Sequence, residues 1–342
     1  MRLLVTGGAG YVGSHTCVVL LQAGHELVVL DDFSNSGEDV VRTIRDLTGG
    51  KLESIEADIR DRMAVRAALA LGSYDAVLHF AALKSAPEST AEPARYWDVN
   101  VGGMAILLDE MLARGIGNFV FSSSAIVYGR QEHVPIAETA ATVALNPYAS
   151  TKLAGEAMLQ EIAGVNPRFR ACSLRYFNPV GGHPSGRLGE RPRRPGGNLF
   201  PMILKACREH TAIGVNGIDY DTPDGSTIRD FVHVMDLAEG HAAALAFLLR
   251  SRDSDPAGAW TFNLGTGHGA SVLELIAATE KVMGREIQRR IGPRRDGDIV
   301  VSVADVERAA SILGWRARRT LEQACADAVR ALEKAPGAPQ GK

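Results

Sequence analysis

Short apolar runs alternate with longer segments of helical periodicity through the first half of the chain. These runs lie at Arg2–Thr6, Glu26–Leu30, Leu52–Ala57, Ala76–Phe80, Phe119–Phe121 and Arg170–Leu174. Fully buried strands of a parallel sheet have such continuous apolar patterns, and the segments between the runs are long enough for crossover helices. The pattern therefore predicts an α/β fold built on a doubly wound parallel sheet.

The sequence changes in character at about residue 176. Gly/Pro-rich stretches at 178–186 and 191–197 indicate long irregular loops, of the kind that often bind ligands. Helical patterns return at Asp236–Leu249, Ser271–Met283 and Leu321–Leu332. We therefore expect a first domain over residues 1–176, with about 230–250 packing back on it, and a smaller mixed α/β substrate domain over 177–338.

Length, charge and cysteine content narrow the class of protein. The chain has 342 residues and a formal net charge of −3, which argues against the strongly basic surface with which proteins bind nucleic acid. It contains no apolar run of about 18 residues and no signal-peptide pattern, so we expect a cytoplasmic protein with no membrane partner. Its four cysteines are widely spaced and match neither a metal site nor a disulfide framework.

A glycine-rich turn joins the first predicted strand to the first helix. Gly7, Gly10 and Gly13 lie in the string Thr6-Gly7-Gly8-Ala9-Gly10-Tyr11-Val12-Gly13. Such a turn lets the backbone approach a pyrophosphate, and the free N–H groups at the helix start favour its negative charge. The string therefore predicts a Rossmann-type dinucleotide site.

A carboxylate stands where the adenosine ribose of such a dinucleotide would lie. Asp31 ends the second predicted strand, 18 positions after Gly13, and can accept hydrogen bonds from both ribose hydroxyls. Because its charge would repel a 2′-phosphate, we predict NAD rather than NADP; Asp32 could share the role. Asp58 could approach the adenine amino group, and Phe80-Ala81-Ala82 offers small residues beside a cofactor.

A tyrosine, a lysine and a serine cluster are candidates for acid–base chemistry. Tyr148 and Lys152 are four residues apart, on one face of a helix that Asn146-Pro147 can start. A nearby lysine cation lowers the pKa of a tyrosine from about 10 toward neutrality, which suits Tyr148 for general base work. Ser122-Ser123-Ser124 follows the fifth predicted strand, so at least one hydroxyl should lie at the carboxyl edge of the sheet.

Five further strings carry a family resemblance. They are His79-Phe80-Ala81-Ala82-Leu83-Lys84, Phe121-Ser122-Ser123-Ser124-Ala125 with Val127-Tyr128-Gly129, Arg175-Tyr176-Phe177-Asn178-Pro179-Val180-Gly181, Arg229-Asp230-Phe231-Val232-His233-Val234-Met235-Asp236-Leu237-Ala238, and Pro293-Arg294-Arg295-Asp296-Gly297-Asp298. With the glycine turn and the Tyr–Lys pair, the chain resembles the extended short-chain dehydrogenase/reductase family. Within it, the chain resembles the UDP-glucose (UDP-galactose) 4-epimerases over nearly its whole length.

This resemblance implies a mechanism. In these epimerases bound NAD takes a hydride from C4 of the hexose while the tyrosine, here Tyr148, removes the proton of the 4-hydroxyl. The 4-keto sugar then turns its other face and takes the hydride back, which gives the C4 epimer. Ser124 would hydrogen-bond the 4-oxygen, and Lys152 would tune Tyr148 and hold the nicotinamide ribose.

The resemblance also assigns binding residues. On the cofactor side they are Gly7, Gly10, Tyr11, Val12, Gly13, Asp31, Asp32, Phe33, Ser34, Asn35, Ser36, Asp58, Ile59, Phe80, Ala81, Ala82, Lys84, Asn100, Ser122, Tyr148, Lys152 and Phe177. On the substrate side they are Lys84, Ser124, Tyr148, Phe177, Asn178, Asn198, Leu199, Arg229, Arg295, Asp298 and Ser302. Arg229 and Arg295 are the cations expected on the diphosphate, and Asp298 is expected near the uridine.

Three positions depart from the family pattern. Ile126 stands where threonine is common, which removes an auxiliary hydrogen bond near the sugar, and Ile218 replaces an asparagine. Ser302 stands where some members carry a bulky tyrosine and others a small residue that leaves room for a 2-acetamido group. UDP-N-acetylhexosamines are therefore expected as further substrates.

Other functions stay open at this point. One is a 4-epimerase of UDP-glucuronate or a UDP-pentose, and another is a non-catalytic NAD-binding sensor, which would not need the Tyr148–Lys152 pair. A 4,6-dehydratase of the same fold places an Asp-Glu pair after the strand-end Ser/Thr, where this chain has Ala125-Ile126, and neither residue can transfer a proton. Family members often dimerise through a pair of helices, so we expect a homodimer.

Overall fold

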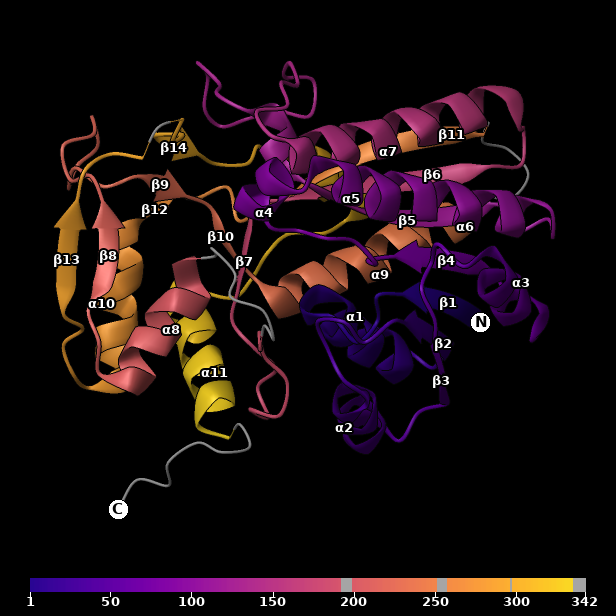
Figure 1. The fold of residues 1–342 in the computed structure, drawn as a ribbon, viewed down its shortest axis with the longest axis horizontal. Coiled ribbons are helices and arrows are strands. Elements are labelled where there is room, and N and C mark those ends of the chain that lie inside the picture. Colours follow the sequence, from indigo (N-terminus) through magenta and orange to yellow (C-terminus); the bar gives the residue numbers. More distant parts are fainter. Residues whose placement is uncertain (192–198, 251–256, 296, 335–342) are drawn as a thin grey trace.

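A seven-stranded parallel sheet forms the larger part of the molecule (Figure 1). The computed structural model describes residues 1–191, 199–250, 257–295 and 297–334. The strand order is β11-β6-β5-β4-β1-β2-β3, with parallel pairing between all neighbours. The order runs in opposite directions on the two sides of β1, which is the arrangement of a doubly wound fold. The predicted fold class is therefore confirmed.

Six strands of this sheet occupy the predicted apolar runs, with shifts at their ends. They are β1 (Arg2–Thr6), β2 (Glu26–Asp31), β3 (Leu52–Glu56), β4 (Ala76–His79), β5 (Asn118–Ser124) and β6 (Arg170–Tyr176), and the seventh strand is β11 (Gly258–Leu264). The prediction that the three serines follow the fifth strand is wrong, because Ser122–Ser124 pair with Leu174–Tyr176 and so continue the ladder. Strand β11 is absent from the predicted strands, and it pairs with β6 at the edge of the sheet.

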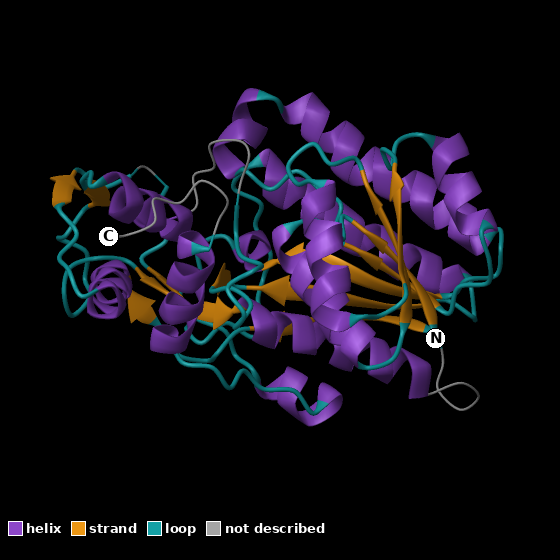
Figure 2. Cartoon of the chain, turned by 90° about the horizontal axis from the view of Figure 1, so that it is seen from below, coloured by secondary structure: helices purple, strands orange, loops and turns teal. Residues whose placement is uncertain are grey.

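Helices cover both faces of the sheet (Figure 2). They are α1 (Tyr11–Gln22), α2 (Glu38–Thr48), α3 (Arg62–Ala70), α4 (Ala86–Ala91), α5 (Pro93–Trp97), α6 (Gly103–Leu112), α7 (Pro147–Val165) and α9 (Val234–Arg250). Successive side chains of a strand point to opposite faces. Leu3 and Val5 of β1 accordingly join the core formed with α1, α2 and α9. Leu4 joins the core formed with α3, α6 and α7.

A smaller group of elements lies at the other side of the molecule in Figure 1. It contains the helices α8 (Leu199–Glu209), α10 (Val272–Met283) and α11 (Leu321–Glu333), which share one apolar core. Its strands form the pairs β7 (Asn178–Val180) with β10 (Phe231–His233) and β8 (Ile213–Asn216) with β13 (Arg289–Gly292), and the sheet β12 (Ala270–Ser271), β9 (Ile228–Arg229), β14 (Val301–Ser302).

The helix ends of this smaller part follow from local chemistry. Ser271 caps α10 in a capping box with Glu274, and Gly284 ends the helix at a φ of 65°, so the helix starts one residue later than predicted. The domain division at residue 176 stays a prediction. Strand β11 and helix α9 come after that residue in the sequence, and both pack with the large sheet.

The described residues show three further features. None of their helices is both long and apolar enough to cross a lipid bilayer. All four cysteines are free and buried. Within the described ranges, no group of three or more His, Cys, Asp or Glu side chains is arranged to hold a metal ion.

Candidate active site

The glycine turn is closed so tightly that side chains would not fit. Gly7 has a φ of 70°, and a Cβ on it would lie 2.4 Å from the backbone N of Ala81, in the loop that follows β4. A Cβ on Gly13 would lie 2.3 Å from the carbonyl oxygen of Gly7. Gly10 is the N-cap residue of α1, and no side chain caps the first N–H groups of this helix. Such a helix start suits an anion.

Tyr11 and Lys84 tie this turn to the loop after β7. The Tyr11 hydroxyl donates to the Gly181 carbonyl at 2.8 Å, and Nζ of Lys84 lies 2.7 Å from Oε1 of Glu190. Burial and the Glu190 charge raise the pKa of Tyr11 well above its ordinary value. Val12 packs against the core beneath α1. Through its contacts with Tyr11 and Glu190, Lys84 connects the predicted cofactor side to the loop after β7.

Asp31 is buried at the carboxyl end of β2, with 7% of its surface exposed. Its Oδ2 accepts from the backbone N–H of Ala9 at 3.0 Å, and its Oδ1 accepts from Phe33 N–H at 3.0 Å and from Ser36 Oγ at 3.1 Å. Burial raises the pKa of Asp31, and these hydrogen bonds act against the rise. The carboxylate therefore links the glycine turn to the loop that follows β2.

The rest of that loop is more exposed. Asp32 is exposed and accepts from the backbone N–H and the hydroxyl of Ser34, so its carboxylate shapes a local turn. Phe33 is half-buried with a φ of 51°, and Asn35 is exposed. The structure thus brings Asp31 and Ser36 together at the end of β2, whereas Asp32, Ser34 and Asn35 are exposed on the loop that follows.

The other predicted cofactor residues surround the ends of β3 and β4. Asp58 forms an ion pair with Arg60 at 2.6 Å, which lowers the pKa of Asp58. Ile59 is buried, and Phe80, Ala81 and Ala82 are half-buried. Asn100 is 4% exposed; its amide bonds both backbone groups of Leu83 and the Thr151 hydroxyl, so it holds the loop after β4 against α7.

The three predicted catalytic residues meet where β5 ends against α7. Ser124 is the last residue of β5, and Tyr148 and Lys152 lie on the first turns of α7, which Asn146 caps by accepting from Ala149 N–H at 2.9 Å. Nζ of Lys152 donates to the Ser122 carbonyl at 2.7 Å and lies 5.7 Å from the Tyr148 ring centroid. The Ser122 hydroxyl accepts a hydrogen bond from Tyr176.

The predicted fall in the pKa of Tyr148 is wrong for this structure. Burial raises the pKa of Tyr148 to about 12, with hydrogen bonding to Ser124 acting in the opposite direction. Burial also lowers the pKa of Lys152 to about 7, against the attraction of the Glu156 carboxylate. The physical reason is that desolvation disfavours both charged forms, and the Lys152 ammonium is directed at the Ser122 carbonyl rather than at the phenol.

Two buried residues beside this group have no role in the sequence predictions. Glu156 on α7 and Arg175 on β6 are 8% and 6% exposed and form an ion pair at 2.5 Å. Glu156 also accepts from the Ser123 hydroxyl at 2.5 Å. One signal could have found Glu156, because it follows Tyr148 and Lys152 at the same four-residue spacing.

The backbone leads directly from this edge to the predicted sugar and diphosphate residues. Ser124 pairs with Tyr176, Phe177 donates its N–H to the Leu264 carbonyl at 3.1 Å, and Asn178 donates its N–H to the Asp230 carbonyl at 2.9 Å. Phe177 is buried, with its ring centroid 6.5 Å from that of Tyr128, whereas Asn178 is exposed. Arg229 directly precedes Asp230 in the chain, so this hydrogen bond leads from Asn178 to Arg229.

The remaining predicted substrate residues gather at the small sheet of β9 and β14. Arg229 and Asp298 form an ion pair at 2.9 Å with side chains 18% and 19% exposed. Burial lowers the pKa of Arg229, and Asp298 acts against this fall. Ser302 pairs with Arg229 in register and accepts the Asp230 N–H at 2.9 Å through its carbonyl. Arg295 is exposed.

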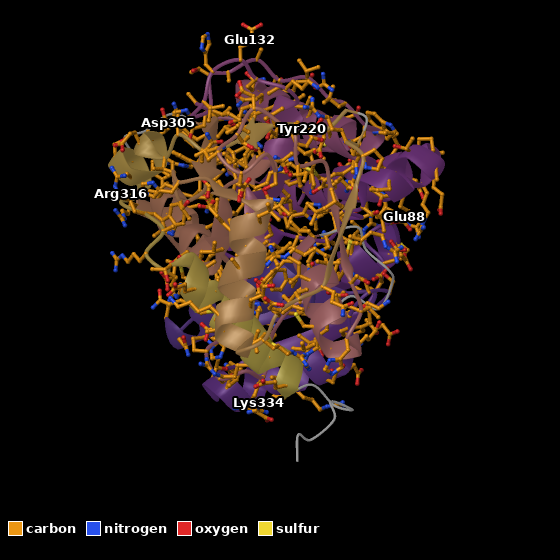
Figure 3. All side chains as sticks on the ribbon, turned by 90° about the vertical axis from the view of Figure 1, so that its left-hand side faces the viewer. Glu88, Glu132, Tyr220, Asp305, Arg316 and Lys334 are labelled. Carbon is orange, nitrogen blue, oxygen red and sulfur yellow. The ribbon has the colours of Figure 1, made fainter. Side chains whose placement is uncertain are left out.

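A cavity of about 540 Å³ opens beside this group. Asp298 and Arg295 line it together with Tyr220 and, from the loop after β5, Arg130 and Glu132; Figure 3 labels Tyr220 and Glu132. The Tyr220 hydroxyl lies 3.5 Å from Oδ2 of Asp298. The predicted uridine-side residues therefore border an open hollow.

Four predicted positions need separate mention. Asn198 lies outside the described residues, and Leu199 is the first residue of α8, where it packs on the core of the smaller part. Ile126 is half-buried in the short turn after Ser124 and donates its N–H to the Ser124 hydroxyl at 3.3 Å. Ile218 is 47% exposed, so it does not add to the core.

Comparison with known proteins assigns this site to a family. The model of the NAD dependent epimerase/dehydratase family matches residues 3–265. The chain is 47% identical to a UDP-glucose 4-epimerase of Bacillus subtilis over 331 residues, which are 96% of each chain. The chain therefore belongs to the NAD dependent epimerase/dehydratase family. Two further UDP-glucose 4-epimerases, from Erwinia amylovora and Yersinia pestis, are 43% and 44% identical to the chain, again over 96% of each chain.

Solved structures agree with this assignment. One is a UDP-glucose 4-epimerase from Stenotrophomonas maltophila with bound NAD and formylated UDP-arabinopyranose; it has a TM-score of 0.93 and 46% identity, covering 97% of this chain and 98% of that one. Another, from Bifidobacterium longum in complex with NAD+ and UDP, has a TM-score of 0.93 and 40% identity, covering 99% and 100%.

NAD is the cofactor of this family, and the described residues fit it. The glycine turn has no room for a Cβ at Gly7 or Gly13, and no side chain caps the start of α1. A buried carboxylate, Asp31, ends the next strand of the sheet. These are the two features that a dinucleotide with an unphosphorylated adenosine ribose requires.

Proposed function

We propose that the protein interconverts UDP-galactose and UDP-glucose by reversible epimerisation at C4. The observation that carries this proposal is the meeting of Ser124, Tyr148 and Lys152 at the end of β5, on the sheet edge that also carries the glycine turn. The full-length similarity to UDP-glucose 4-epimerases supports it. A sensor that only binds NAD would not need a half-buried tyrosine next to a lysine and a serine.

The residues proposed to hold NAD lie at or after the carboxyl ends of neighbouring strands of the large sheet. The glycine turn would receive the pyrophosphate, and Asp31 would accept from the adenosine ribose, with Asp58, Phe80 and Asn100 bordering the same face. When bound, NAD supplies a reversible acceptor for the hydride of C4. Lys152 would donate to the nicotinamide ribose, since its ammonium already lies at the end of β5.

Tyr148 is the proposed acid and base. Its phenolate would take the proton of the 4-hydroxyl and later return it to the 4-oxygen, while the Ser124 hydroxyl hydrogen-bonds that oxygen. Because burial raises the pKa of Tyr148 to about 12, the phenolate needs added positive charge nearby. Lys152, 5.7 Å from the ring, can supply that charge while it is protonated.

Epimerisation also requires the sugar to turn while its nucleotide stays bound. We assign the nucleotide to Arg229, Arg295 and Asp298, with Asn178 and Phe177 between them and the catalytic edge. Arg229 is paired with Asp298, so the diphosphate would compete with that carboxylate for the guanidinium. Only the hydride acceptor and Tyr148–Ser124 would then contact the reacting carbon and oxygen, which leaves the sugar free to rotate.

The test is to incubate the purified protein with UDP-galactose, UDP-GalNAc and UDP-galacturonate separately, with no added NAD, and to identify the products. We expect UDP-glucose from the first. Turnover without added cofactor would support tight retention of NAD. No turnover on any of the three would contradict the proposal and favour the sensor.

A second candidate concerns pentoses. The similar Stenotrophomonas structure holds a formylated UDP-arabinopyranose, so a UDP-pentose belongs in the same assay. For hexosamines, the small side chain at Ser302 favours acceptance of a 2-acetamido group. A preference for a UDP-pentose over UDP-galactose in kcat/KM would replace the first proposal with this one.

We also propose a cytoplasmic homodimer that associates through α6 and α7. Partly buried apolar side chains lie on these helices at Ile106, Leu112, Met158 and Ile162, and Trp97 on the neighbouring α5 is 43% exposed. Sedimentation equilibrium should give twice the chain mass of 36.5 kDa. A monomer at every concentration would contradict it.

A further inference from the structure

A buried ion pair lies one helical turn beyond the catalytic lysine. Oε1 of Glu156 accepts from Nε of Arg175 at 2.9 Å, and Oε2 accepts from Nη2 at 2.5 Å. Both residues are less than a tenth exposed. A buried pair of this kind is weak evidence for stability, because desolvation opposes its Coulomb attraction. Its place beside Lys152 therefore calls for another explanation.

The pair is connected to the strand that holds the catalytic groups. Glu156 accepts from the Ser123 hydroxyl at 2.5 Å. Ser123 lies between Ser122, whose carbonyl accepts from Lys152 at 2.7 Å, and Ser124. In the ladder Ser123 pairs with Arg175. One carboxylate thus joins α7, β5 and β6 at the level of the active site.

The Arg175 guanidinium is fixed on its far side as well. It lies 4.8 Å from the ring centroid of Tyr128, and its Nη1 donates to the Glu138 carbonyl at 3.4 Å. The Tyr128 hydroxyl donates to Asn263 at 2.6 Å. Arg175 therefore has little freedom to follow Glu156 if that carboxylate moves, and the charge pair stays at a fixed place relative to Lys152.

The charges around Lys152 single out Glu156. Tyr148 and Glu156 from α7 and His79 from β4 interact with Lys152. Arg175 and Tyr176 from β6 bind its neighbours, the Glu156 carboxylate and the Ser122 hydroxyl. Glu156 is the anion of this set. Burial lowers the pKa of Lys152, and the Glu156 carboxylate opposes that fall.

We propose that the Glu156–Arg175 pair is a positioning unit for Lys152: it keeps the lysine charged and holds its ammonium against the Ser122 carbonyl. The proposal rests on the proposed function, because that function makes Lys152 catalytic. Neither residue of the pair contacts the substrate in this scheme; each acts through Lys152.

The two halves of the pair should act with opposite sign. Glu156→Gln removes the negative charge and leaves the Arg175 cation, so Lys152 should lose its proton at lower pH. Arg175→Gln leaves an unpaired carboxylate, so Lys152 should keep its proton to higher pH. The double variant restores neutrality and should resemble the parent. A purely structural role would give both single variants the same defect.

The experiment is an NMR titration of the full-length protein loaded with NAD and labelled at the lysine Cε carbon. The chain has only seven lysines, and Lys152→Met identifies the signal. We expect the Lys152 midpoint to fall by about one pH unit in Glu156→Gln and to rise by a similar amount in Arg175→Gln. Glu156→Asp should recover most of the loss. The alkaline limb of kcat/KM should move in the same directions.

A matched control is Arg319→Gln, which breaks the pair with buried Asp236 and should leave the Lys152 midpoint unchanged. Equal midpoints in the parent and Glu156→Gln, or shifts of the same sign in both single variants, would overturn the proposal. If Arg175→Gln does not fold, the comparison of Glu156→Gln with Glu156→Asp decides. A protein with no epimerase activity would refute the proposed function, while the titration would still test the pair.

Discussion

The two ends of the proposed active site are built in different ways. At the catalytic end, Lys152, Ser123 and Glu156 are buried, and each is hydrogen-bonded to a residue of β5 or α7. At the nucleotide end, Arg229 and Asp298 are about a fifth exposed and pair with each other, next to an open cavity.

This difference follows from what each end must do. Proton transfer needs a fixed geometry, which regular elements in register provide. Nucleotide binding needs charged groups that can exchange one partner for another, which short strands and loops at the surface allow. We therefore expect substitutions at the catalytic end to act on kcat and those at the nucleotide end to act on KM.

The largest expected effect tests the catalytic end. Tyr148→Phe removes the proton acceptor and keeps the ring, so kcat should fall by about a thousandfold with little change in KM. The measurement is steady-state kinetics with UDP-galactose. A matched control is Tyr74→Phe, a buried tyrosine whose hydroxyl donates to the Ala68 carbonyl, outside the proposed active site. Parental kcat in Tyr148→Phe would remove the catalytic assignment.

The next effect tests the nucleotide end. Arg229→Met removes a charged donor from the diphosphate, and such hydrogen bonds contribute ~1.5–3 kcal/mol each. KM for UDP-galactose should therefore rise by roughly ten- to a hundredfold, with kcat nearly kept. Arg294→Met, which breaks an exposed pair with Asp219 at the same cavity, should change KM by less than about threefold. A fall in kcat alone for Arg229→Met would break the comparison.

A third effect concerns stability. Burial lowers the pKa of His15 and His79 to about 3 and that of His241 to about 4. Below pH 6.5 the unfolded chain binds more protons at these sites than the folded one, so stability is lost as the pH falls. At pH 5 the loss should be ~2 kcal/mol for each histidine, measured by urea unfolding.

His241→Gln should remove the ~2 kcal/mol that this histidine contributes to the loss of stability at pH 5. His268→Gln, at an exposed site, should leave it unchanged. An identical pH dependence of the unfolding free energy in the parent and His241→Gln would contradict the assignment of a buried, neutral His241.

The smallest effect tests selectivity at the nucleotide end. Ser302→Tyr should lower kcat/KM for UDP-GalNAc by about tenfold and change that for UDP-galactose by less than threefold, because a bulky ring would occupy the space of the acetamido group. Equal failure of the parent and the variant on UDP-GlcNAc, with both active on UDP-galactose, would refute the idea.

The sequence predicted the catalytic end better than the nucleotide end. The structure brings Tyr148 and Lys152 next to the serines, because helix spacing puts the first two on one face of α7 and β5 ends at the sheet edge. The choice of Ser124 among the serines came from the family resemblance, and the catalytic roles of all three residues stay predictions. The glycine turn was found because its positive φ and close approach leave glycine as the residue that fits.

Other features depend on tertiary contacts that periodicity does not contain. The Glu156–Arg175 pair joins residues 19 apart in sequence, and the lowered Tyr148 pKa was predicted from the lysine spacing alone, without the cost of burial. Strand β11 was missed because it carries polar residues at an edge of the sheet. The pairing of Arg229 with Asp298 links residues 69 apart.

The most direct test of transient oxidation at C4 uses isotopes. The protein is incubated with UDP-galactose that carries deuterium at C4, in ordinary water without added cofactor, and the UDP-glucose formed is analysed by mass spectrometry. We predict that the product keeps the deuterium at C4, because the same hydride is removed and returned within one active site. Loss of the deuterium to solvent would contradict epimerisation by hydride transfer.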